Sequence, residues 1–120
     1  MNILDLEGEK FKSVTVFGYT FKIRFITQKD RLMIGNRRAD IQGNRNIDAM
    51  TVDEFSRAEN IATVDICTES MPKEFNQNES CVNWPDDDLV TELAEEIRKH
   101  STDIKERLKK NRPLERGEKG

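Results

Sequence analysis

The fold is decided in the stretch Phe25-Ile-Thr-Gln-Lys-Asp-Arg-Leu-Met-Ile-Gly-Asn-Arg-Arg-Ala-Asp-Ile-Gln-Gly43, which joins the strand-like part of the sequence to its first helical part. Thr27 is a good N-cap, because its hydroxyl can accept a hydrogen bond from the backbone amide of Lys29 or Asp30. Gly43 can take the positive φ with which helices often end. We therefore predict a helix over about residues 28–42.

This helix is predicted to have one apolar and one solvated side. The apolar side comprises Leu32, Met33, Ile34, Ala39 and Ile41, and the solvated side Arg31, Asn36, Arg37, Arg38 and Asp40. The sequence that follows is predicted to be mainly helical, so later helices can pack against the apolar side.

Before this helix, apolar and polar residues alternate, as in half-buried strands. The alternating apolar residues are Val14 and Val16 in one run and Phe21, Ile23 and Phe25 in the next. The two runs meet at Gly18, which can take a positive φ, so we predict a β-hairpin over about residues 11–26. An isolated hairpin is only marginally stable in water, so its aromatic face must lie on a helix or on another chain.

Two further helices are predicted after Gly43. Thr51-Val-Asp-Glu54 matches a capping box and opens a helix over about 52–70, on whose apolar face Phe55 is expected to be central to stability. Asp86 is the expected N-cap of a last helix over about 87–110. The apolar stripe of that last helix thins after Ile97, so its far half is either exposed to solvent or an arm that binds a partner.

These elements predict a mainly helical α+β protein, with an N-terminal hairpin followed by about three helices. We expect residues 1–110 to form a single domain and residues 111–120 to be a flexible C-terminal tail. Charged residues make up 36% of the chain and hydrophobic ones 35%, which suits wide solvated faces or a core completed by a partner.

Composition gives no indication of nucleic-acid or membrane binding. The net charge of −3 is too balanced for either, and no apolar run approaches the roughly 18 residues of a membrane span. The N-terminal residues lack a signal-peptide pattern, so a cytoplasmic location is expected. Cys67 and Cys81 are too few for a disulfide framework or a zinc site and should remain thiols.

No catalytic, cofactor-binding or metal-binding residue is predicted, and an enzyme is not expected. His100 has no partner at a ligand spacing and is expected to be solvated. The triplet Asp86-Asp87-Asp88 lacks the ligand pattern of an EF-hand, so helix capping is favoured over a cation site. Cys67 is interpreted as a buried small hydrophobe, whereas Cys81 would be reactive only beside a cationic group.

A basic surface is the other feature with a functional alternative. Its residues are Arg37, Arg38, Lys105, Arg107, Lys109, Lys110, Arg112 and Arg116. These cations could contact nucleic acid, but acidic residues interrupt them and no aromatic platform accompanies them. A solvated helix end, with cations near the negative end of the helix dipole, is the favoured interpretation.

The candidate partner-binding residues are apolar residues that a small domain can leave uncovered. They are Phe21, Ile23 and Phe25 on the hairpin, Trp84 before the last helix, and Ile97, Ile104 and Leu108 on that helix. Trp84 has the alternative role of fixing its loop to the core. We favour the last helix as the binding surface, because its sparse stripe suits pairing with a long client helix.

The order of elements resembles that of the tail assembly chaperones of long-tailed bacteriophages. The resemblance runs from about residue 14 to 108, in weak motifs. These are Phe21-Lys-Ile-Arg-Phe25, Thr27-Gln-Lys-Asp30, Ile34-Gly-Asn-Arg-Arg-Ala39, Thr51-Val-Asp-Glu-Phe55 with Ala58, Ala62, Thr63-Val-Asp65 and Pro72, and Asn83-Trp-Pro-Asp86.

The resemblance implies a non-catalytic protein of the host cytoplasm that binds the phage tape-measure and tail-tube proteins during tail morphogenesis. No catalytic residues belong to the family, and self-association is left open. One alternative is a small structural protein of the phage tail or baseplate, located in the virion tail. Another is a phage protein that binds a host protein.

Overall fold

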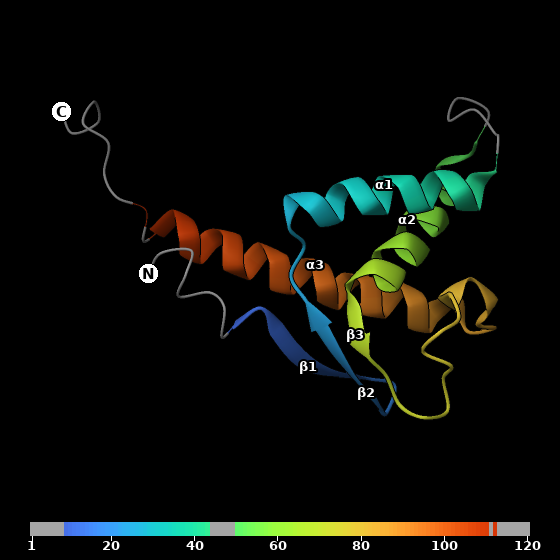
Figure 1. Ribbon diagram of the computed structural model, residues 1–120, viewed down its shortest axis with the longest axis horizontal. Helices are drawn as coiled ribbons and strands as arrows, with labels where there is room; N and C mark the ends of the chain where they lie inside the picture. The colour runs from blue at the N-terminus through green and yellow to red at the C-terminus, as the bar shows by residue number, and fades with distance from the viewer. Residues whose placement is uncertain (1–8, 44–49, 111, 113–120) are drawn as a thin grey trace.

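The computed structural model describes residues 9–43, 50–110 and 112, and the predicted tail otherwise lies outside this part. In chain order the elements are β1 (Phe11–Val16), β2 (Tyr19–Arg24), α1 (Gln28–Gln42), α2 (Val52–Cys67), β3 (Thr68–Ser70), the short 3-10 turn η3 (Cys81–Asn83) and α3 (Asp87–Lys110) (Figure 1). The predicted α+β class and its mainly helical character are confirmed.

The predicted hairpin is present. β1 and β2 pair antiparallel with Val14 opposite Phe21, and the turn between them is formed by Phe17 at φ 49° and Gly18 at φ 84°. Positive φ at both central residues is the pattern of a type I′ turn, whose twist matches that of the strands. Gly18 was expected to supply such a φ, whereas Phe17 was not.

The third strand corrects the predicted end of the second helix. α2 ends at Cys67, and residues 68–70 form β3, which pairs antiparallel with β2 across a register shift. The Arg24 guanidinium of β2 also bonds the Glu69 carboxylate of β3, at 2.7 Å. β3 therefore supplies hydrogen-bond partners to backbone groups at the edge of β2. Helix periodicity in the sequence could not reveal this pairing.

α3 crosses one face of the sheet and forms the centre of the core (Figure 1). Phe21 and Ile23 of β2 and Leu93 and Ile97 of α3 are fully buried. The loop before α3 covers one end of this core, since the Trp84 ring packs at a tilted angle against that of Phe75, with ring centroids 4.6 Å apart. Trp84 thus fixes its loop to the core, as one of its two interpretations expected.

α1 begins and ends as predicted but buries less than predicted. Thr27 and Asp30 form a capping box, and Gly43 ends the helix at φ 71°. Of the expected apolar side, however, Leu32 is 73% exposed and Met33 is 40% exposed, whereas Ile34 is buried. α1 packs against α2, and Asp30 and Ile34 are the residues of α1 that become buried.

α2 also starts at its predicted capping box, in which the Thr51 hydroxyl accepts from the Glu54 amide. Phe55 is only half-buried and lies under the Arg38 guanidinium, 4.8 Å from the ring centroid. The expectation that Phe55 is buried on the apolar face of this helix is therefore wrong. The buried face of α2 starts one turn later, at Ala58 and Ala62.

Candidate functional site

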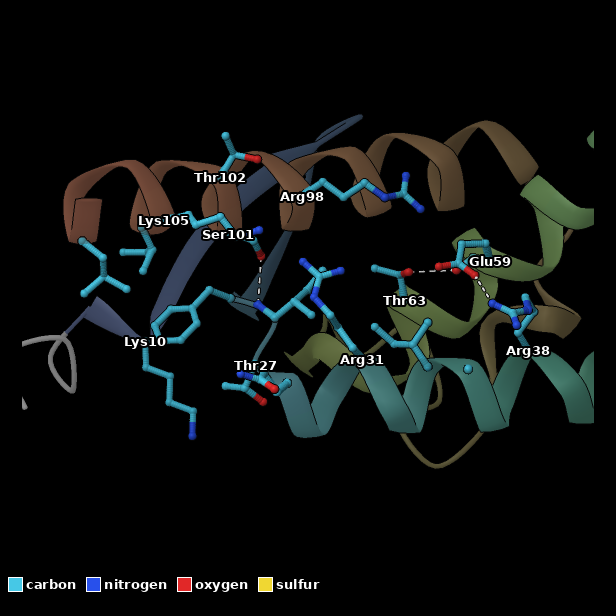
Figure 2. A pocket seen from close by; sticks show the side chains of 17 residues that line it. Lys10, Thr27, Arg31, Arg38, Glu59, Thr63, Arg98, Ser101, Thr102 and Lys105 are labelled. Atoms are coloured by element: carbon cyan, nitrogen blue, oxygen red, sulfur yellow. Dashed lines mark hydrogen bonds and ion pairs between the residues drawn. The ribbon is translucent and has the colours of Figure 1, made fainter. Parts of the chain in front are cut away.

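The described residues enclose a groove of about 790 Å³ between α1 and the C-terminal half of α3. α2 packs against both helices and keeps them apart, so that side chains of α1 and α3 face one another across the opening (Figure 2). This volume lies in the range of typical ligand pockets. The groove is open to solvent between the two helices.

Apolar side chains form the floor of this groove. They are Phe25 and Ile26 from the link after β2, Ile34 from α1, and Ile104 and Leu108 from α3. Ile34 and Ile104 are buried, while the other three are half-buried and reach the opening. A ligand seated here would remove that apolar surface from water, which favours binding.

The rim of the groove is basic. Arg31 and Arg38 project from α1 and Arg98 and Lys105 from α3, each pair seven residues apart and thus on one helix face (Figure 2). Glu59 is the one carboxylate among the residues that line the groove. The groove therefore carries a local positive charge although the whole chain is at −3.

Two of these cations are already tied to α2. The Arg38 Nη1 donates to the Glu59 carboxylate at 2.9 Å, and the Arg98 Nη2 donates to the Asn60 amide oxygen at 2.7 Å. Within the described ranges, Arg31 and Lys105 have no carboxylate at ion-pair distance, so their charges are available to a ligand.

Two hydrogen bonds fix the end of the groove near Phe25. The Ser101 hydroxyl accepts from the Ile26 backbone amide at 2.8 Å and donates to the Ile97 carbonyl at 2.8 Å. This places the link between β2 and α1 directly on α3. The Thr63 hydroxyl, which also lines the groove, donates to the Glu59 carbonyl of its own helix α2 at 2.8 Å.

The structure divides the seven predicted partner-binding residues. Phe25, Ile104 and Leu108 come together in the groove. Three others, Phe21, Ile23 and Ile97, are fully buried between β2 and α3, so they are not accessible to a partner in the folded chain. Trp84 lies apart, in the aromatic cluster of the loop before α3.

The far half of α3 is less exposed than its sparse stripe suggested, because Ile104 is only 3% exposed. A charge placed at Ile104 would thus disturb the fold as well as any binding surface. Leu108, which is half-buried at the groove, remains the more accessible of the two.

The expectation that His100 is solvated is wrong. His100 is 6% exposed, its Nε2 lies 3.3 Å from the Lys10 carbonyl, and its ring is 5.9 Å from that of Phe25. One face of α3 covers β1 here, and the histidine fills that contact. Its surroundings are those of a packing residue.

The thiols are both buried. Burial raises the pKa of the Cys67 thiol to about 12, and burial together with the nearby Asp65 carboxylate raises the pKa of the Cys81 thiol well above its ordinary range. The interpretation of Cys67 as a small hydrophobe agrees with this. The thiol of Cys81 is held protonated, which is the opposite of a reactive cysteine.

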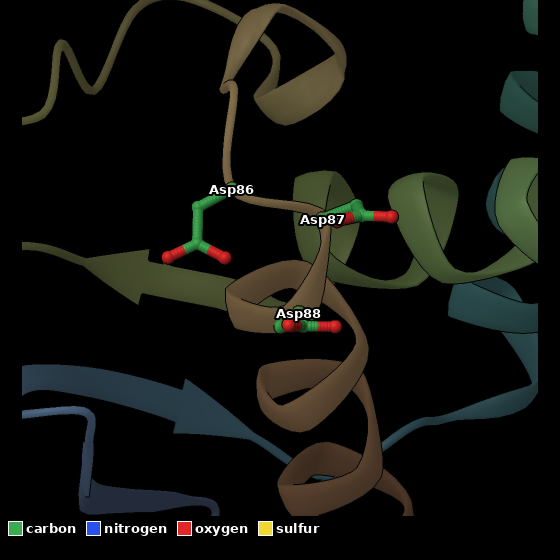
Figure 3. Close-up of side chains that lie close together, drawn as sticks. All are labelled: Asp86, Asp87 and Asp88. Carbon is green, nitrogen blue, oxygen red and sulfur yellow. The ribbon is translucent and has the colours of Figure 1, made fainter.

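The acidic triplet lies on the surface at the start of α3 (Figure 3), and its first member caps the helix. Carboxylate oxygens of Asp86, Asp87 and Asp88 lie within 4.8 Å of one another on the surface. The Asp86 Oδ1 accepts from the Leu89 amide at 3.1 Å, and Asp87 pairs with Arg57 of α2 at 2.9 Å. The Asp86 contact agrees with the capping interpretation, while Asp87 ties the start of α3 to α2.

The basic rim is the part of the groove that the sequence interpretation missed. The spacing Arg31…Arg38 in one helix and Arg98…Lys105 in another was available as a signal. Arg31 and Arg38 were assigned to a solvated helix side and Lys105 to a solvated helix end, and Arg98 was not singled out. Nothing in one sequence shows that the two helix faces oppose each other.

Comparisons with known proteins leave the function open. A scan against protein-family models, a search of curated protein sequences and a search of solved structures each gave no significant match. Among the described residues, no helix is both long and apolar enough to cross a bilayer.

Proposed function

We propose that this chain is a non-catalytic binding protein that holds a segment of another protein in the groove between α1 and α3. The groove itself carries this proposal. Its floor offers half-buried apolar side chains at Phe25, Ile26 and Leu108, and its polar groups Ser101 and Thr63 are already bonded within the fold. Accessible apolar side chains beside polar groups that are already satisfied are typical of a protein-binding surface.

The biological role we propose is that of a tail assembly chaperone of a long-tailed bacteriophage. Support comes from the resemblance in element order, in which the two capping boxes, at Thr27 and Thr51, and the cap at Asp86 start the successive helices. The proposed clients are the tape-measure and tail-tube proteins, bound in the host cytoplasm before assembly.

Co-expression tests this role. The tagged chain would be produced with the tape-measure protein, and separately with the tail-tube protein, encoded in the same phage genome. A stable complex with either one, together with absence of the chain from purified mature virions, is the expected result.

Two results would replace the proposal with its alternatives. A fixed number of copies in mature virions would make the chain a structural tail or baseplate protein. Failure to bind either tail protein, combined with specific capture of one host protein from an uninfected lysate, would make it a host-directed phage protein.

A further inference from the structure

The groove also specifies the chemistry of its occupant, and this step rests on the proposed binding function. We infer that the groove takes an amphipathic α-helix whose apolar stripe is flanked by acidic side chains. The apolar floor, the basic rim and the length of the groove each contribute to this inference.

Length and shape favour a helix. The α3 residues that line the groove run from Arg98 to Leu108, a rise of about 15 Å at 1.5 Å per residue. An occupant lying alongside would match this length with about three helical turns. A third helix packed between α1 and α3 would present an apolar residue every three or four positions to the floor, as in other helix-in-groove complexes.

The positive charge of the groove rim favours acidic residues on both flanks of the bound helix. Arg31 stands on the α1 side and Lys105 on the α3 side, and neither has a carboxylate partner in the described part of the chain. Carboxylates on both edges of the docked helix would meet these cations at the groove rim. Basic flanks would be repelled there, which gives the groove a preference for acidic clients.

Nucleic acid is the less suitable occupant. A polynucleotide would place phosphates at the rim, but it would leave the aliphatic floor of Ile34, Ile104 and Leu108 without a matching surface. Phe25 is the one aromatic residue that lines the groove, so a series of stacking contacts is not available.

Gly35 provides a way to block the groove without damaging the fold. It lies on the groove side of α1, between Arg31 and Arg38, and a Cβ built there has no atom within 4 Å. Leucine also has a higher helix propensity than glycine. Gly35→Leu should therefore fold at least as well as wild type while filling the groove. Asn36→Leu is the matched control, since Asn36 is the next residue of the same helix, is exposed, and does not line the groove.

The test uses the full chain and three fluorescent probes, measured by anisotropy. The first is a designed 18-residue helical peptide with leucines on one stripe and glutamates on both flanks, the second replaces every glutamate with lysine, and the third is a 20-nucleotide single-stranded DNA. We expect the acidic peptide to bind at least tenfold more tightly than the basic one, and its affinity to fall as salt rises.

The variants then locate the binding. Gly35→Leu should weaken binding of the acidic peptide at least tenfold, Arg31→Glu should weaken it and reduce its salt dependence, and Asn36→Leu should leave it unchanged. Equal affinity for the two peptides, or undiminished binding to Gly35→Leu, would overturn the inference. Displacement of the acidic peptide by the DNA at comparable concentration would overturn it in favour of a nucleic-acid site.

The same variant separates this inference from the proposed function. If a tail protein co-purifies equally with wild type and Gly35→Leu, the chaperone role stands and the groove is not its binding site. If the acidic peptide binds in the groove but neither tail protein does, the groove inference stands and the chaperone role fails.

Discussion

Replacing Asp30 with alanine should cost more stability than replacing any other acidic residue in the first turn of a described helix. Asp30 is only 4% exposed. Its carboxylate accepts hydrogen bonds from the Arg24 guanidinium at 2.7 Å and from the Thr27 backbone amide at 3.0 Å. It therefore joins the end of β2 to the start of α1. No other first-turn acid in the described helices is buried.

The size of the effect follows from what Asp30→Ala leaves behind. Arg24, whose side chain is 19% exposed, would keep Glu69 as its remaining partner, and the Thr27 amide would lose its acceptor. Breaking a buried ion pair typically costs about 3–5 kcal/mol. Because Glu69 still compensates Arg24, we expect the lower end, about 3 kcal/mol, or roughly 12 °C in melting temperature for a chain of this size.

The acid limb of the stability curve supplies a second readout. Burial would raise the pKa of the Asp30 carboxyl, but the hydrogen bonds from Arg24 and Thr27 outweigh burial and hold that pKa below its ordinary value. A carboxyl with a lowered folded-state pKa stabilises the fold above its unfolded pKa of about 3.9, and this stability is lost as pH falls below that value. Asp30→Asn should flatten this loss.

Urea denaturation from pH 2.5 to 7, followed by circular dichroism, measures both effects. Asp53→Ala is the control, since Asp53 is also a first-turn acid paired with an arginine but has a side chain that is 76% exposed. The free energy of unfolding of Asp53→Ala should stay close to that of wild type. A loss below about 1 kcal/mol for Asp30→Ala, or an unchanged acid limb for Asp30→Asn, would refute the reasoning.

Three further predictions concern the core, the hairpin and the thiols. Phe21→Ala should cost about 3–5 kcal/mol by chemical denaturation, whereas Phe55→Ala should cost only about 1 kcal/mol because its ring is half-buried at the surface. Gly18→Ala should cost about 1 kcal/mol in the same assay, since φ of 84° is unfavourable for any residue with a Cβ. Cys67 and Cys81 should react with a thiol reagent at pH 8 far more slowly in the native protein than in urea, and equal rates would contradict their burial.

Local signals in the sequence were sufficient for the starts of the helices. Thr27, Thr51 and Asp86 cap helices as predicted, because an N-cap depends on side-chain and backbone groups only three residues apart. The end of α2 was missed for the opposite reason. Residues 68–70 become a strand through pairing with β2, some 45 residues earlier in the chain.

Burial on helix faces was the harder prediction. Leu32 and Met33 are core residues by type, yet α1 leaves both exposed. His100 and Ile104 are buried on the half of the last helix that was expected either to be exposed to solvent or to bind a partner. The hydropathy pattern shows which residues share a helix face, but not which of the other helices or strands covers that face. The groove lies between two such faces. The sequence could predict which residues lie on each face, but not that the two faces lie opposite each other.

The shape of the groove depends on where α1 is anchored. Arg37 bonds Asp65 at 3.0 Å and Arg38 bonds Glu59 at 2.9 Å, which fixes the middle of α1 to α2, while Asp30 fixes its first turn to Arg24 of β2. These polar anchors hold α1 beside α2 and away from α3. A groove that is already open before its ligand arrives avoids part of the ordering cost of binding. Asp30→Asn loosens this anchor and should therefore weaken peptide binding in the groove. The loss of affinity should exceed the loss that the fraction of unfolded Asp30→Asn protein alone would cause, and peptide titration at 10 °C would measure it.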